Sequence, residues 1–202
     1  MLNDRSSILS LLATRRSGKP RELVGPGPSP AELEEILTIA ARVPDHGKLT
    51  PWRFVLIGDD QRDALARLLH QALAEEDPEA LPAIHEKAEE FAHYAGQLVV
   101  LVAAPTAGHK IPVWEQQLSA GTAGMNLLLA AHALGFVAGW VTGWPAYSPR
   151  VTAALCAPGE RIAGFIFIGH PQRELEERPR PALDEVVRRW TPPRNGEGDR
   201  DA

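Results

Sequence analysis

Apolar positions along the chain alternate between helical and extended patterns. A spacing of three and four residues, typical of one buried helix face, recurs in five segments. These segments are 4–14, 30–43, a stretch that opens at Asp59 or Asp60, 82–95 and 114–134. Short β-branched or aromatic runs predict strands at 52–57, 98–104, 136–142 and 162–168. This alternation, with a further short helix opening at Ser148, predicts a layered α/β or α+β fold of about four strands and five or six helices.

Four of these segments carry more specific signals. Ser29 and Glu32 form a capping box around Pro30 and predict a sharp start for the second helix. The runs 98–104 and 162–168 are apolar without interruption, so both strands are expected to be buried on both faces. Helix 114–134 is small and apolar nearly all round. It must therefore be covered on most sides, at the centre of the fold or at a subunit interface.

Composition limits the class of protein. The chain has 202 residues, 44% of them hydrophobic and 23% charged, which predicts one globular domain over 1–195 followed by a disordered tail over 196–202. A net charge of −5 argues against a nucleic-acid-binding surface, and no apolar run is long enough to span a membrane. The N-terminus does not have the pattern of a signal peptide. Cys156 is the only cysteine, which fits a reducing cytoplasm.

Three short segments are candidates for chemistry, and each also has a purely structural interpretation. Arg15-Arg16-Ser17 follows the first helix and suits a phosphate, or neutralises the end of that helix. The proline-flanked loop 44–52 either carries residues of a functional site or is only a turn held rigid by its prolines. The glycines of 139–143 let a flat group approach the backbone, or mark a bulge.

A fourth pattern favours no site. His85, Glu89 and His93 share one helical face, a spacing that would allow a metal ion. Acidic and basic neighbours make a solvated face the better interpretation, and no metal is expected. The chain also lacks the glycine-rich fingerprints of Rossmann and P-loop nucleotide sites and the nucleophile elbow of serine hydrolases.

Taken together and in this order, these segments resemble the flavin-dependent nitroreductase family over roughly residues 5–190. The segments PDH-x₄-PW and HKIPVWEQQLSAG are most similar to its small NAD(P)H nitroreductase (YdjA-like) subgroup. The resemblance implies an α+β nitroreductase-like sandwich with a central mixed sheet flanked by helices. It also implies a homodimer with FMN at two interfacial sites, each built from both chains.

The implied activity is an FMN-dependent oxidoreduction. NADH or NADPH would reduce the cofactor, and a nitroaromatic or quinone-type acceptor would then reoxidise it in a ping-pong hydride transfer. The cofactor carries this chemistry, so no catalytic acid or base is expected among the side chains. The alternatives are a flavin enzyme of the same fold with a non-nitro substrate, a non-catalytic flavin-binding module, and a purely structural dimer.

The resemblance assigns ten residues to FMN. Those expected at the phosphate and ribityl chain are Arg15, Arg16, Ser17 and Arg180. Lys19 is expected near flavin N1 and the C2 carbonyl, and Arg42 and His46 are expected to reach the flavin from the second subunit. Trp140, Val141 and Thr142 are expected along the isoalloxazine ring. The family often has serine and asparagine where Asp45, His46 and Lys48 stand, which implies a narrower and more polar pocket.

Overall fold

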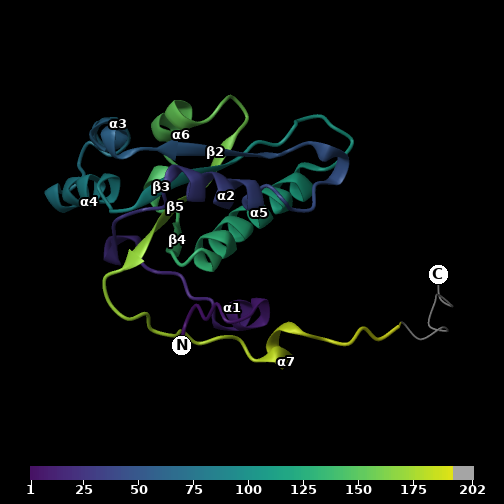
Figure 1. Cartoon of the computed structure of the whole chain (residues 1–202). Helices are drawn as coiled ribbons and strands as arrows, with labels where there is room; N and C mark the ends of the chain where they lie inside the picture. Colours follow the sequence, from purple (N-terminus) through teal and green to yellow (C-terminus); the bar gives the residue numbers. More distant parts are fainter. Residues whose placement is uncertain (193–202) are drawn as a thin grey trace, which may run out of the picture.

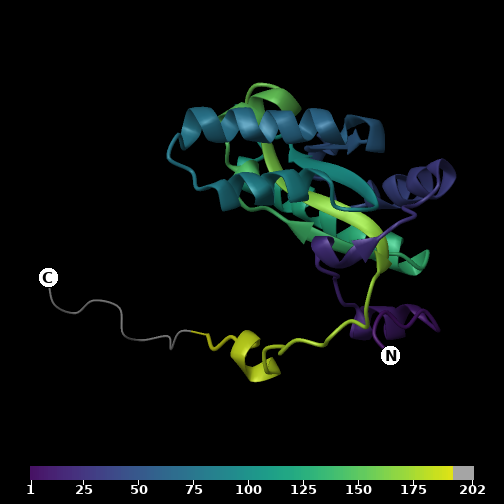
Figure 2. The same ribbon diagram turned by 90° about the vertical axis from the view of Figure 1, so that its left-hand side faces the viewer.

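The computed structural model describes residues 1–192, so the tail predicted over 196–202 lies outside the described residues. A sheet lies between two layers of helices (Figure 1). One face carries α2 (Pro30–Ala40) and α5 (Val113–Ala133). The other face carries α3 (Arg62–Glu76), α4 (Pro82–Ala92) and α6 (Pro149–Leu155), and α3 and α4 lie side by side (Figure 2). The expected α+β sandwich is confirmed.

The sheet has five described strands. They are β1 (Leu23–Val24), β2 (Trp52–Ile57), β3 (Gln97–Ala103), β4 (Val137–Val141) and β5 (Arg161–Pro171). β5 pairs with β3, β4 and β1, while β2 pairs with β3. Each described pairing is antiparallel, whereas the sequence predicted a mixed sheet. The crossover through α5 places β4 parallel to β3 but one strand away, and β5 fills the gap antiparallel to both.

The two central strands are buried on both faces, as their apolar runs predict. In β3, Leu98, Val100 and Val102 face α3 and α4, while Val99 and Leu101 face α2 and α5. All five side chains are fully buried. The same alternation runs along β5, which therefore lies at the centre of the core.

Helix boundaries follow local capping. The capping box of Ser29 and Glu32 is present at the start of α2, as predicted. The first helix, α1 (Ile8–Thr14), begins four residues later than expected because Ser7 is its N-cap. The predicted cap at Asp59 or Asp60 is wrong, since these residues form a 3₁₀ turn and α3 begins at Arg62. β1 has only two residues, which are too few to show the alternating pattern from which a strand is predicted.

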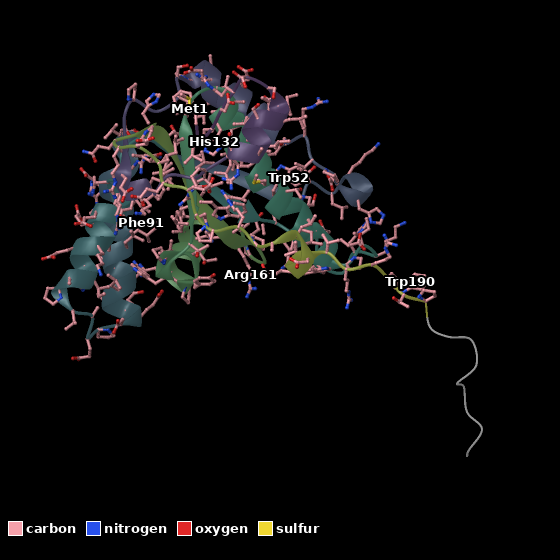
Figure 3. All side chains as sticks on the ribbon, turned by 90° about the horizontal axis from the view of Figure 1, so that it is seen from below. Met1, Trp52, Phe91, His132, Arg161 and Trp190 are labelled. Atoms are coloured by element: carbon pink, nitrogen blue, oxygen red, sulfur yellow. The ribbon has the colours of Figure 1, made fainter. Side chains whose placement is uncertain are left out.

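Several apolar side chains remain exposed on the single chain. Leu11 is the buried residue of α1, and the rest of its predicted apolar face points away from the core. Beyond β5, an arm that includes α7 (Leu183–Val186) leaves the body of the molecule (Figure 2), with Trp190 near its end (Figure 3). The exposed apolar residues of these segments and of α5 are Ile8, Leu9, Leu12, Val113, Trp114, Leu118, Met125, Leu183, Val186, Val187 and Trp190. No helix among residues 1–192 is both long and apolar enough to cross a bilayer.

His132, in the last turn of α5, ties this helix to β4. Its Nε2 accepts a hydrogen bond from the backbone N–H of Ala138 at 3.1 Å, and its side chain is 1% exposed. Burial, and then the positive charge of Arg15, lowers the pKa of His132 to about 4. The imidazole is therefore neutral at pH 7, and its proton is on Nδ1, which has no partner among the described residues.

We expect His132 to make the free energy of unfolding decrease as the pH falls from 6.5 to about 4. Because the folded-state pKa lies below the unfolded value, the unfolded chain binds the proton first and acid favours it. The full contribution is present above 6.5, and the loss amounts to at most about 3 kcal/mol. Urea denaturation across this window measures it. A His132→Gln variant, which keeps an acceptor but does not titrate, should show a flatter profile, and equal profiles would contradict the assignment.

Candidate active site

The segment that carries Arg15 to Lys19 packs directly against β4 through Gly18. Glycine makes this approach possible, because a Cβ on Gly139 would lie 2.4 Å from the carbonyl oxygen of Gly18. A Cβ on Gly18 would in turn lie 2.8 Å from Val137 Cγ1. Two segments far apart in the sequence, both singled out by sequence analysis, are thus brought together.

Three arginines gather at this segment. Arg180, from the C-terminal arm, donates to the carbonyl oxygen of Arg15 at 3.2 Å, and Arg15 donates from Nη1 to Ser17 Oγ at 3.1 Å. Arg16 donates from Nε to the carbonyl oxygen of Glu176 at 2.7 Å, which ties the arm to the body. Burial, and then the charges of Arg180 and Arg16, lowers the pKa of Arg15. The predicted phosphate residues therefore lie together in a site that favours an anion.

A cavity of about 510 Å³ opens next to this cluster, at the end of β4. Its volume is in the range of small-molecule and cofactor sites. Its walls come from the segment before β1, from α4 and from the turn after β4. The lining residues are Gly18, Lys19, Pro20, Arg21, Lys87, Glu90, Phe91, Tyr94, Val141, Thr142, Gly143, Trp144 and Pro145. Lys19, which also pairs with Glu22 at 3.2 Å, lines both this cavity and the groove beside Arg16 and Ser17.

Trp140 has a different environment from its two predicted neighbours. Val141 and Thr142 line the cavity. The Trp140 indole instead packs against Gly124 of α5 and Gly164 of β5, and its Nε1 donates to the carbonyl oxygen of Ala163 at 3.0 Å. Any contact from Trp140 to a ligand is therefore left to its backbone.

Arg42 and His46 do not share this cavity in the single chain. They belong to the loop between α2 and β2, which packs on α5 through Ser119, whose hydroxyl donates to the carbonyl oxygen of Pro44 at 2.5 Å. The cavity borders α4, on the opposite face of the sheet. β2 is also separated from β4 by β3 and β5, which corresponds to about 14 Å across the sheet. Within one chain, Arg42 and His46 therefore do not reach the cavity.

The structure also shows groups that the sequence analysis did not single out. Glu115, in the first turn of α5, lies 2.8 Å from His46 through its Oε2 and the imidazole Nδ1. Three residues of α4, with Tyr94 just beyond its end, form one wall of the cavity. Helical spacing indicates which residues share a face of α4. It cannot indicate that this face borders a cavity, because that depends on how the helices pack on the sheet.

The face of α4 with His85, Glu89 and His93 is only partly solvated. Its side chains pair with α3: His70 lies 3.1 Å from His85 and 2.8 Å from Glu89, and His93 lies 2.9 Å from Asp63. These contacts form a chain of hydrogen bonds between two helices. Within residues 1–192, no group of three or more such side chains is arranged to hold a metal ion.

Comparison with known proteins identifies the family of the chain. The profile of the Nitroreductase family matches residues 12–170, which is most of the chain. The chain belongs to the nitroreductase family. A Haemophilus influenzae protein named "Putative NAD(P)H nitroreductase" is 39% identical over 173 residues, covering 83% of this chain and 90% of the relative. The Escherichia coli K12 protein named "Putative NAD(P)H nitroreductase YdjA" is 36% identical over 167 residues, covering 81% and 88%.

Solved structures of nitroreductases share the fold. A nitroreductase-like family protein from Bacillus cereus has a TM-score of 0.76 at 22% identity, covering 91% of this chain and 95% of its own. A nitroreductase from Bacteroides fragilis, crystallised with bound FMN, has a TM-score of 0.67 at 21% identity, covering 90% and 98%. The resemblance to this family and the fold that it implies are therefore confirmed.

Proposed function

We propose that this family member is an FMN-dependent oxidoreductase that takes electrons from NADH or NADPH and passes them to a nitroaromatic or quinone-type acceptor in ping-pong order. The observation that carries the proposal is the cluster of Arg15, Arg16 and Arg180 beside a cavity at the end of β4. Names of relatives that specify NAD(P)H, and solved relatives crystallised with FMN, support it.

The residues present fit FMN. The three arginines and Ser17 supply charged and hydroxyl donors for a phosphate, and half-burial of Arg15 strengthens its hydrogen bonds. The adjoining cavity has aromatic and glycine walls that suit a flat ring system. When bound, FMN supplies the hydride chemistry. The chain's own residues bind and orient it, and Lys19 places a positive charge at the cavity wall.

The same proposal includes a homodimer in the cytoplasm. One face of α5 exposes Trp114, Leu118 and Met125, whose spacings of four and seven residues place them along one side of the helix as an apolar stripe. A stripe of this kind on a long helix is typical of a subunit interface. In a pair of chains, the loop of one chain that carries Arg42 and His46 would line the cavity of the other chain.

The decisive experiment is anaerobic titration of the purified protein with NADH and with NADPH. We expect a yellow protein whose visible absorbance bleaches with one equivalent of donor per FMN and returns when the acceptor is added. A colourless protein that cannot be loaded with FMN would contradict the proposal. A yellow protein that does not bleach would indicate a binding module. A panel of nitroaromatic and quinone acceptors then identifies the oxidant.

Replacing Arg15 by alanine should weaken FMN binding by about 10- to 150-fold, because a charge-assisted hydrogen bond contributes about 1.5–3 kcal/mol. Equilibrium titration of apoprotein, followed by flavin fluorescence, measures the dissociation constant. Arg67→Ala, which removes an exposed arginine from α3, is the matched control and should bind FMN normally. Equal affinities of the Arg15 variant and wild type would remove Arg15 from the site.

The homodimer should persist at micromolar concentration in analytical ultracentrifugation. Leu118→Arg, in the middle of the exposed stripe of α5, should shift it toward monomer, because it places a charge in the apolar centre of the interface. The monomeric variant should also lose FMN affinity, since Arg42 and His46 would no longer reach the cavity. A folded, FMN-loaded monomer of the wild-type chain would contradict the shared site.

A further inference from the structure

His46 is held in one orientation by a carboxylate from a distant part of the chain. Its Nδ1 lies 2.8 Å from Oε2 of Glu115, which is 69 residues away on the first turn of α5. A carboxylate at this position accepts a hydrogen bond, so the imidazole proton must be on Nδ1. The opposite nitrogen, Nε2, has no hydrogen-bond partner among the described residues, and 69% of the side chain is exposed.

The loop around His46 is independently rigid. Both carboxylate oxygens of Asp45 accept backbone N–H groups, from Leu49 at 3.0 Å and from Thr50 at 2.8 Å. Lys48 and Thr50 have φ angles of 57° and 49°, a left-handed conformation that a β-branched residue such as Thr50 rarely adopts. Such a conformation persists only where its surroundings enforce it, and it is often found at functional sites.

The pair is not needed to hold this loop. Exposed ion pairs typically contribute about 0–1 kcal/mol to stability, and both side chains of this pair are exposed. The loop is already tied to α5 by Ser119, and Asn126 donates to the carbonyl oxygen of Ile39 at 2.6 Å. What Glu115 alone determines is which imidazole nitrogen is hydrogen-bonded and which one faces outward.

We propose that Glu115 is a positioning residue that holds His46 by Nδ1 and presents Nε2 to the cavity of the partner subunit. The inference rests on the proposed function, since it takes FMN to bind in that cavity and the site to be shared between two chains. With Nδ1 committed to Glu115, Nε2 is the nitrogen that contacts the bound cofactor or substrate. Any proton that His46 exchanges with them passes through Nε2.

A double-mutant cycle tests this coupling. Glu115→Ala should weaken FMN binding about tenfold and shift the flavin absorbance spectrum when His46 is present. In the His46→Ala background the same change should alter the affinity less than about twofold, because coupled residues are not additive. Glu115→Gln, which keeps an acceptor at the same length, should recover most of the loss. Glu34→Ala, an exposed glutamate of α2, is the control and should change neither quantity.

A second measurement reads the histidine directly and needs no FMN. In nitrogen-15 spectra of protein labelled at its seven histidines, the His46→Ala variant identifies the signals of His46. Wild type should show a single tautomer with protonated Nδ1, and Glu115→Ala should show a mixture of tautomers. Glu115→Gln should remain close to wild type.

Two results would overturn the proposal. One is a neutral His46 ring in wild type that carries its proton on Nε2 and not on Nδ1, since Glu115 would then not be its acceptor. The other is an equal loss of FMN affinity on Glu115→Ala in both backgrounds, which would mean that Glu115 acts through the stability of α5. A wild-type protein that neither binds FMN nor bleaches with NAD(P)H, but retains the expected tautomer, would instead contradict the proposed function.

Discussion

Burial of β3 and β5 on both faces is the constraint on which the rest of the structure depends. A strand with apolar side chains on both sides needs a layer of helices above and below, and the two hydrophobic clusters provide them. With β5 at the centre, β4 must lie at its free edge, one strand away from β3. The segment with Arg15 then packs against β4 through Gly18 and Gly139. The position of the arginine cluster thus follows from the burial of the core.

The same constraint divides the candidate site into two halves. A rigid sheet keeps the α2–β2 loop on one face and the cavity on the other, so one chain presents His46 and the cavity in different places. Twofold pairing through the exposed face of α5 would cover Trp114, Leu118 and Met125.

The sequence predicts the layers well and the details of the site less completely. Uninterrupted apolar runs and the Ser29 capping box are local signals, and the structure agrees with both. The strand directions were not predictable in the same way, because they depend on which strand fills the gap between β3 and β4. Glu115 carries no local signal either, since its contact with His46 spans 69 residues. Trp140 shows the converse: it lies in a glycine-rich motif suited to a ligand, yet its indole belongs to the core.

Both halves of the site have features that would be unfavourable in a chain that stayed alone. Arg15, Arg16 and Arg180 place like charges close together, and burial of Arg15 weakens the solvent's ability to screen them; Glu177, which pairs with Arg180 at 2.9 Å, offsets this repulsion only in part. In the other half, Thr50 holds a left-handed backbone beside a loop whose histidine has an outward-facing nitrogen without a partner. Neither feature contributes to the core, which is complete without them. A bound phosphate would neutralise the first, and a ligand in the neighbouring chain's cavity would give Nε2 of His46 a partner.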